Sequence, residues 1–173
     1  MQAVRILELP PLKAACFGPL TTPERFEAFD AWFSAYHARL KGEFYPRDFM
    51  WYNERLGANE WFDALPEGSD LADIGGYEGI ERPCGLYAVA SCLDADRDQA
   101  ADWLETHAFL RQWAASSARF KPYENGPCRP ERYPLFHIVS PGRLQAEGVS
   151  IEDLYDPIEA REGSLPISQG GVL

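Results

Sequence analysis

A carboxylate lies among aromatic residues in the second half of the sequence, and this combination suits the binding of a cation. Glu131 precedes Tyr133 by two positions, in a segment that also holds Arg129 and Arg132. The faces of aromatic rings attract positive charge, and a carboxylate beside them supplies a counter-ion. The group therefore predicts a site for an apolar cation, with further rings drawn from other parts of the chain.

Aromatic residues make up 13% of the chain, and about half of them fall outside helical spacing. Most of these stand in or beside segments that we expect to be strands, where their rings can share one surface with Glu131. The candidate ligand-binding residues are Glu131, Tyr133, Trp51, Tyr52, Trp61, Tyr87, Trp113 and Tyr123. Two plainer interpretations remain open: the rings can fill the core of a small domain, and Glu131 can be a surface carboxylate beside two arginines.

Sequence motifs for nucleotides, catalytic serines and zinc-binding helices are absent. The chain contains no G-x-G-x-x-G, Walker A loop, G-x-S-x-G or H-E-x-x-H. Its histidines, His37, His107 and His137, are too widely spaced in sequence to predict a metal cluster. We therefore expect no metal and no cofactor.

The balance of charge argues against a nucleic-acid-binding surface. Lys and Arg number 16 against 27 Asp and Glu, which gives a formal net charge of −11. Phosphate contacts need a basic face, so we expect no direct contact with DNA. No apolar run approaches the roughly 18 residues of a membrane span, and residues 1–13 do not resemble a signal peptide. We expect a cytoplasmic protein with no membrane partner, in which the four cysteines are reduced.

Apolar spacing predicts two long helices. Thr22 is a suitable N-cap for the first and Pro23 a suitable first residue, because the missing N–H of proline has no partner there in any case. The residues at intervals of three and four that form its apolar face are Phe26, Phe29, Phe33, Tyr36 and Leu40, and Gly42 ends it. The second helix is expected over residues 96–117, with Trp103, Leu110 and Trp113 on one face.

Short apolar segments around these helices predict strands. Residues 4–17 indicate one strand that bends at Pro10-Pro11, because proline cannot donate to a sheet ladder. Further strands are expected at residues 49–52, 60–65, 86–90, 133–139 and 151–158. We expect loops at residues 70–79 and 142–148, where glycines gather.

The order of these elements repeats. Each half contains a proline-broken strand, a helix and two strands, and Ala15 aligns with Ala88 as Trp32 aligns with Trp103. Two units that are too small to bury their own faces would share one sheet. We therefore predict an α+β fold in which duplicated βαββ units form one antiparallel sheet, with two long helices on one face and a central ligand cleft.

This organisation predicts a single domain over residues 1–160. Its repeats are expected at about residues 1–68 and 78–160. Residues 161–173 show no periodicity and contain two adjacent glycines, so we expect a loose C-terminal tail.

With these elements in order, the chain resembles the GyrI-like (gyrase-inhibitor-like) family of effector-binding domains, which also occur as ligand domains of AraC- and MerR-type regulators. The resemblance extends from Val4 to about Ile158. The segments that carry it are Leu9-Pro-Pro-Leu-Lys-Ala14, Pro83-Cys-Gly-Leu-Tyr-Ala88, Leu110-Arg-Gln-Trp-Ala-Ala-Ser116, Gly126-Pro-Cys-Arg-Pro-Glu-Arg-Tyr133 and Asp153-Leu-Tyr-Asp-Pro-Ile158. Residues 51–55 depart from the acidic turn of the family, and residues 134–149 are longer than expected.

The resemblance implies a cleft in which Glu131 is the pocket glutamate and Tyr133 its partner, with Trp51, Tyr52 and Tyr87 lining the walls. Three functions remain open at this point. The first is a stand-alone protein that binds a small hydrophobic or cationic molecule. The second is a hydrolase of electrophilic or toxic compounds in which Glu131 activates water and Tyr133 donates a proton. The third is a module that inhibits a protein partner such as gyrase; a homodimer is also open.

Overall fold

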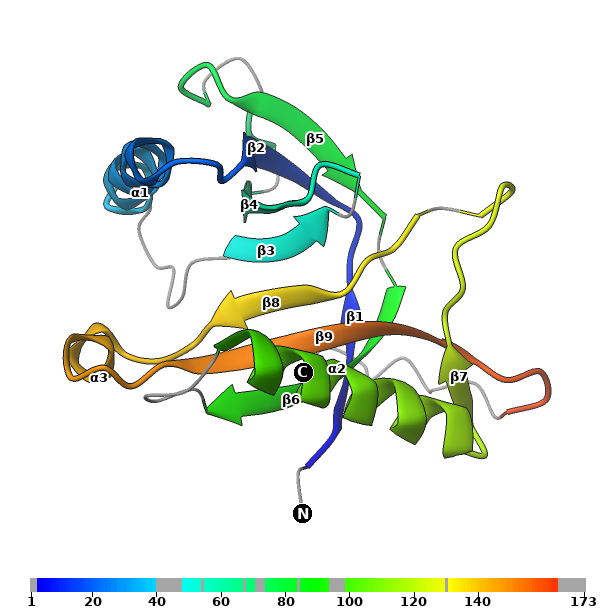
Figure 1. Cartoon of the computed structure of the whole chain (residues 1–173). Helices are drawn as coiled ribbons and strands as arrows, with labels where there is room; N and C mark the ends of the chain where they lie inside the picture. The colour runs from blue at the N-terminus through cyan, green and yellow to red at the C-terminus, as the bar shows by residue number, and fades with distance from the viewer. Residues whose placement is uncertain are drawn as a thin grey trace, which may run out of the picture.

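Nine strands of the computed structural model form one curled antiparallel sheet, and two long helices lie on one face of it (Figure 1). The model describes residues 3–39, 48–53, 55–66, 68–70, 74–83, 85–93, 99–129 and 131–164. The strands are β1 (Arg5–Leu9), β2 (Leu12–Pro19), β3 (Asp48–Asn53), β4 (Ala58–Ala64), β5 (Glu78–Arg82), β6 (Gly85–Leu93), β7 (Phe120–Pro122), β8 (Leu135–Ile138) and β9 (Ile151–Ala160). The helices are α1 (Pro23–His37), α2 (Gln99–Ser116) and the short α3 (Gly142–Ala146).

The order of the strands confirms the predicted duplication. Along the sheet the strands run β1-β6-β9-β8-β3-β4-β2-β5, so reversing the order exchanges the two halves of the molecule. The alignment of Ala15 with Ala88 has a structural counterpart, because Ala15 of β2 pairs with Asp63 and Ala88 of β6 pairs with Asp156. Both alanines are fully buried. The halves meet where β3 pairs with β8, at Met50 and Phe136.

Two bent strands run through both halves and hold them together. β1 and β2 are separated only by Pro10-Pro11, and β5 and β6 only by residues 83 and 84. On one side of the bend Leu9 pairs with Gly85, and on the other side Leu12 pairs with Arg82. Because the prolines interrupt the ladder while both chains continue, the sheet changes direction at this point. The bend predicted at Pro10-Pro11 is therefore present, and it has a partner at Pro83.

The first long helix begins as the sequence predicts. Thr22 is its N-cap, and the Thr22 hydroxyl accepts a hydrogen bond from the backbone N–H of Arg25. Phe29 and Tyr36 are buried against the sheet, but Phe26 is 41% exposed, so the apolar face is narrower than predicted. The helix ends at His37 rather than near Gly42, and Leu40 and Gly42 lie outside the described residues.

Buried side chains form separate clusters on the two faces of the sheet. The face that carries both helices holds Phe29 of α1 and Leu110 of α2 against Met50, Phe136 and Leu154. The residues of the opposite face are Ala14, Cys16, Phe49, Trp51, Phe62, Tyr87, Val89, Leu135 and Tyr155. Strand side chains alternate between faces, so each central strand supplies both clusters. No helical residue of the described chain belongs to the second cluster, which leaves that face for the site described below.

Several local predictions need correction. Residues 78 and 79, at the end of the predicted loop, belong to strand β5, because they pair with Cys16 and Ala15 of β2. Residues 142–146 form the short helix α3 within the predicted loop. The three-residue β7, which pairs with β9, carried no apolar alternation to predict it. No helix among the described residues is long and apolar enough to cross a membrane.

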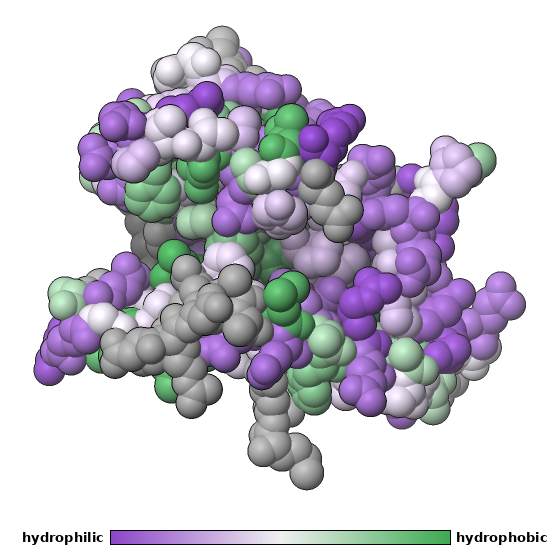
Figure 2. Space-filling model, in the orientation of Figure 1, coloured by the Kyte–Doolittle hydropathy of each residue, from purple (hydrophilic) through white to green (hydrophobic). Residues whose placement is uncertain are grey.

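The end of the described chain is tied to α2. The Arg161 side chain donates hydrogen bonds to the backbone oxygens of Ser117 and Ala115, and the Arg161 backbone N–H donates to Arg119. The rest of the predicted tail, from residue 165, lies outside the described residues. The surface seen in Figure 2 is mainly hydrophilic, and apolar side chains on this view gather toward the indentation between the halves that carry α1 and α2.

Candidate functional site

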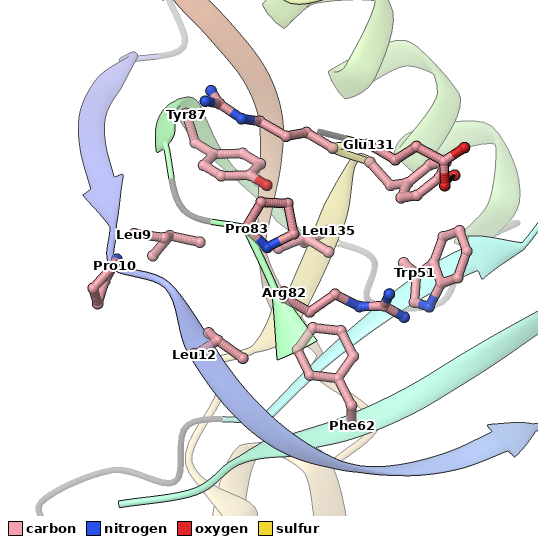
Figure 3. A pocket seen from close by; sticks show the side chains of 12 residues that line it. Leu9, Pro10, Leu12, Trp51, Phe62, Arg82, Pro83, Tyr87, Glu131 and Leu135 are labelled. Carbon is pink, nitrogen blue, oxygen red and sulfur yellow. Dashed lines mark hydrogen bonds between the residues drawn. The ribbon is translucent and has the colours of Figure 1, made fainter. Parts of the chain in front are cut away.

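A small cavity lies where the bent strands meet, on the sheet face opposite the helices. Its volume is about 20 Å³, which is room for one or two water molecules. The side chains come from both bent strands and from the middle of the sheet, as Figure 3 shows. The lining residues are Leu9, Pro10, Leu12, Trp51, Phe62, Arg82, Pro83, Tyr87, Glu131, Arg132, Tyr133 and Leu135.

Aromatic rings in mutual contact form the wall and floor of this cavity. Tyr133 packs on Trp51 with ring centroids 4.4 Å apart. Phe62 packs on Phe49 at 5.8 Å, and Phe49 meets the edge of Tyr155 at 5.5 Å. Offset and edge-to-face pairs of this kind add stability beyond the area that they bury. Trp51 and Phe62 therefore line the cavity as members of two packed ring groups, one with Tyr133 and one with Phe49 and Tyr155.

A basic side chain reaches onto this aromatic surface. The guanidinium carbon of Arg82 lies 5.1 Å from the ring centre of Trp51 and 5.6 Å from that of Phe62. Figure 3 shows the Arg82 side chain extending between these two rings. Arginine stacks well on aromatic faces because its charge is spread over a plane. The place that a cationic ligand would take over the rings is therefore held by the protein itself.

Glu131 and Tyr133 meet at the rim. The Tyr133 hydroxyl donates a hydrogen bond to the Glu131 carboxylate, and Glu131 is exposed. Burial raises the pKa of Tyr133, and the hydrogen bond to Glu131 raises it further, while the charges of Arg55 and Arg82 oppose the shift. The phenol therefore stays protonated at neutral pH and remains a donor.

A wider cleft continues outward from the cavity. Its volume is about 610 Å³, in the range that holds a drug-sized molecule. Cleft and cavity share Leu12, Arg82, Pro83, Glu131 and Tyr133, so one molecule can contact both. The charged residues of the cleft are Lys13 and Arg82 against Glu81 and Glu131. The mouth is therefore balanced in charge, and its apolar end is the aromatic floor.

The structure brings four of the eight candidate ligand-binding residues together at the cavity: Trp51, Tyr87, Glu131 and Tyr133. Trp61 faces the helices instead, because it pairs with Met50 and therefore shares the helical face with it. Its ring packs on Phe26 and its indole N–H donates to Asp48.

The other three candidates also lie away from the cavity. Trp113 packs with Phe120 beneath α2, and Tyr52, next to Trp51 but on the other face of β3, is 56% exposed. Tyr123 is buried beneath the guanidinium groups of Arg129 and Arg132.

Arg82 and the apolar bend were not among the predicted site residues. Leu9, Pro10 and Leu12 line the cavity because the bend turns them inward, and Arg82 reaches it because β5 pairs with β2. The sequence did contain one signal for this position, which is Pro83 in a segment equivalent to Pro10-Pro11. Phe62 is adjacent to Trp61 in the sequence, and the sequence does not show which of these two side chains points toward the cavity. The pairing of Phe49 with Phe62 shows that it is Phe62.

The fold is shared with solved structures of low sequence identity. The C-terminal domain of EcmrR superimposes with a TM-score of 0.57 at 9% identity, over 92% of this chain and 98% of that one. EcmrR in a DNA complex within EcmrR-RPo gives 0.56 at 11% identity, over 91% of this chain and 57% of that one. A hydrolase from Listeria innocua gives 0.50 at 10% identity, over 90% and 91%. Likeness at this level of identity shows a common fold.

Comparisons of the sequence itself give no assignment. No protein-family model matches the chain, and no curated protein matches it. The chain therefore shares the fold of the EcmrR C-terminal domain, and the site residues are the basis for a function.

Proposed function

We propose that this chain is a small-molecule-binding domain of the effector-binding type, and that its ligand lies in the cleft over Trp51, Phe62 and Tyr133. The observation that carries the proposal is the aromatic surface on the sheet face opposite the two long helices, beside a cleft of about 610 Å³. Ligand sites are typically concave and mostly apolar, with a few polar groups that fix orientation. The aromatic floor and the Glu131–Tyr133 pair fit that description.

The fold that the chain shares with EcmrR adds support. EcmrR occurs in a complex with DNA, and its C-terminal domain has the fold of this chain. The GyrI-like resemblance of the sequence points to the same role as a ligand domain. With a net charge of −11, the chain itself is expected to sense a ligand rather than to contact DNA.

The rings support a flat, hydrophobic ligand. A ligand with one or two aromatic rings would stack on Tyr133 at the rim and extend along the cleft. The sign of any charge on the ligand depends on Arg82, because Arg82 already lies over the rings that would attract a cation.

A matched pair of tyrosine variants tests the proposal. Compounds with flat rings should raise the melting temperature of the wild-type protein, with binding then measured by calorimetry. Tyr133→Ala removes a ring from the cleft and should weaken binding about tenfold. Tyr52→Ala removes an exposed ring on the neighbouring face and should leave binding unchanged. A broad panel that stabilises no form of the protein would rule the proposal out.

A hydrolase is the second candidate, and the hydrogen bond between Tyr133 and Glu131 favours it. A carboxylate that activates water and a protonated phenol that donates to the leaving group are the parts of such a reaction. The Listeria innocua protein of the same fold is named a hydrolase. Turnover of an electrophilic substrate that is lost in both Glu131→Gln and Tyr133→Phe would support an enzyme, whereas recovery of every bound compound unchanged would contradict it.

A further inference from the structure

The donors at the floor of the site lack acceptors. Among the described residues, the Arg82 guanidinium contacts the faces of Trp51 and Phe62 and has no hydrogen bond or ion pair with another side chain. Trp51 is 6% exposed, and its indole nitrogen Nε1 is buried without a hydrogen-bond partner. A buried donor without a partner is costly, so such groups commonly mark a place for a ligand or water.

The stacked position of Arg82 leaves its N–H groups able to donate hydrogen bonds to a ligand. A guanidinium that lies with its face on aromatic rings still directs its N–H groups outward in the plane, where they match the two oxygens of a carboxylate. Figure 3 shows the Arg82 guanidinium beside the nitrogen of the Trp51 indole. Two neighbouring donor groups are therefore available at the apolar floor of the site.

We propose that the ligand is an aromatic or arylalkyl acid whose carboxylate accepts hydrogen bonds from Arg82 and from the Trp51 indole N–H. This inference rests on the proposed function, because it assigns the polar group of a ligand in the same cleft. It reverses the charge expected from the sequence, where Glu131 and the aromatic rings suggested a cation. The cation at this site is Arg82.

The sizes of the two spaces agree with an acid of this shape. The inner cavity holds about 20 Å³, which suits a small polar group and not an aromatic ring. The outer cleft holds about 610 Å³ and shares Arg82 and Tyr133 with the inner cavity. The carboxylate therefore occupies the inner end, and the hydrophobic body lies in the cleft against Tyr133 and Leu12.

The carboxylates near the site do not neutralise Arg82. Glu131 is exposed and accepts the Tyr133 hydroxyl, and Glu60, which is buried on the neighbouring strand, accepts the Asn53 side-chain amide. Neither lies within ion-pair distance of Arg82, and Glu81 faces the outer cleft. Of the charged residues that line the inner cavity, Arg82 has its guanidinium over the rings of Trp51 and Phe62, whereas Arg132 has its guanidinium over Tyr123 and Glu131 is exposed at the rim. The charge of Arg82 at the aromatic floor favours an acid.

Three probes of one shape test the proposal: 4-phenylbutyrate, 4-phenylbutanol and 4-phenylbutylammonium, each titrated into the protein by calorimetry at neutral pH. The wild-type protein should bind the carboxylate about tenfold or more tightly than the ammonium compound, with the alcohol between them, because hydrogen bonds between charged groups contribute most. Equal binding of the three, or strongest binding of the ammonium compound, overturns the proposal.

Variants of Arg82 separate charge from shape. Arg82→Met keeps an unbranched apolar side chain over the rings and should reverse the order, so that the ammonium compound binds more tightly than the carboxylate. Arg82→Lys keeps the charge but not the planar donor pair, and should retain a weaker preference for the carboxylate. Arg143→Met removes an arginine that is exposed on α3 and should bind as the wild type does.

The outcomes distinguish this inference from the proposed function. If none of the probes binds the wild type or Arg82→Met, the cleft is not a site for such ligands, and both proposals fail. If all three bind with similar affinity and Tyr133→Ala weakens them equally, the proposed function stands and the acid-specific inference fails. An unchanged preference for the carboxylate in Arg82→Met also overturns it.

Discussion

Tyr155 indicates how strongly the sheet face opposite the helices is shielded from water. The residue is 6% exposed and contacts Phe49 and Tyr87 edge-on. Burial is the main reason that its pKa is raised to about 12, with a further increase from the charge of Asp153 and opposition from Arg5. A phenol in this environment is bound to its proton more tightly than in the unfolded chain, where its pKa is about 10.

The Tyr155 hydroxyl should therefore make stability fall at alkaline pH. Its contribution is complete below pH 10 and is lost as the pH rises from about 10 to about 12, because the unfolded chain ionises first. Two pKa units correspond to about 3 kcal/mol. Urea unfolding at a series of pH values should show a steeper loss in wild type than in Tyr155→Phe. Parallel curves for the two proteins would contradict this.

At the scale of residues, the sequence predicts which side chains could bind a ligand more readily than it predicts which side chains contact each other. Glu131 and Tyr133 are two positions apart, and they do meet through a hydrogen bond. Arg82 is remote from Trp51 in sequence and reaches it only because β5 pairs with β2, β2 with β4, and β4 with β3, which carries Trp51. Composition contains no information about that pairing, so the most distinctive contact of the site could not be predicted.

At the scale of elements, each long helix is fixed to the sheet by a histidine. Nε2 of His37 on α1 lies 2.9 Å from Oδ1 of Asp63 on β4. Nδ1 of His107 on α2 lies 2.7 Å from Oδ2 of Asp156 on β9. Both carboxylates are almost completely buried. Because β4 and β9 are equivalent strands of the two halves, the duplication extends to these polar contacts between helix and sheet.

Loss of one partner of such a pair should be more harmful than loss of both. His107→Leu leaves the Asp156 carboxylate buried without its partner and should lower the free energy of unfolding by about 3–5 kcal/mol. The double variant, His107→Leu with Asp156→Leu, also removes the buried charge and should be more stable than His107→Leu alone. Urea denaturation of the single and double variants measures this, and additive losses would show that the pair is not coupled.

Two adjacent glycines before β5 differ in what surrounds them. Gly75 and Gly76 both have positive φ, at +67° and +83°. A side chain at Gly75 would place Cβ 2.6 Å from the indole nitrogen of Trp32 on α1, whereas nothing lies within 4 Å at Gly76. The loop is therefore packed closely on the helix at the first position and open at the second.

Alanine at these two positions should separate backbone strain from packing. Gly76→Ala should cost about 1–2 kcal/mol of stability, from the left-handed conformation alone. Gly75→Ala carries the same strain and must also displace Trp32, which should add about 1–3 kcal/mol. Thermal unfolding of both variants provides the comparison, and equal losses would mean that Trp32 moves aside freely.

Elements with strong local signals were the ones that the sequence predicted well. Thr22-Pro23 marks the start of α1, because a capping hydroxyl and a proline both suit the first turn of a helix. β5 and β7 are different: β5 contains two glutamates and an arginine among five residues, and β7 ends in proline. Both are strands because they pair with β2 and β9, and such long-range pairing outweighs weak local preference.

At the scale of the whole molecule, the net charge of −11 sets a repulsive background. Like charges spread over a small domain destabilise its compact state, and salt screens them. Raising NaCl from about 20 mM to about 200 mM at pH 8 shortens the screening length from roughly 20 Å to roughly 7 Å, so the melting temperature should rise. KCl should have the same effect. A fall in both salts would mean that surface ion pairs outweigh the repulsion.

The symmetry of the molecule was predictable because each half contains its own proline-broken strand and helix. The way in which the halves join was not, since it depends on two bent strands that cross from one half to the other. That junction forms the cavity, so a cleft between the halves could be predicted, but most of the residues that line it could not. The positive charge in the cavity was missed for the same reason, because Arg82 belongs to one of the crossing strands.

The position of β9 has a consequence for synthesis of the chain. Of the described elements β9 comes last along the chain, and it pairs with β6, β8 and β7 in the middle of its half. The N-terminal half has all of its strands, β2 to β5, by residue 82, so they can pair during translation. The second half lacks its central strand, β9, until residue 160 has been synthesised. During that interval the apolar faces of β6 and α2 stay open, and nascent chains are then most exposed to aggregation. Folding of the N-terminal half first would give the late strands a finished edge, at β3, on which to assemble.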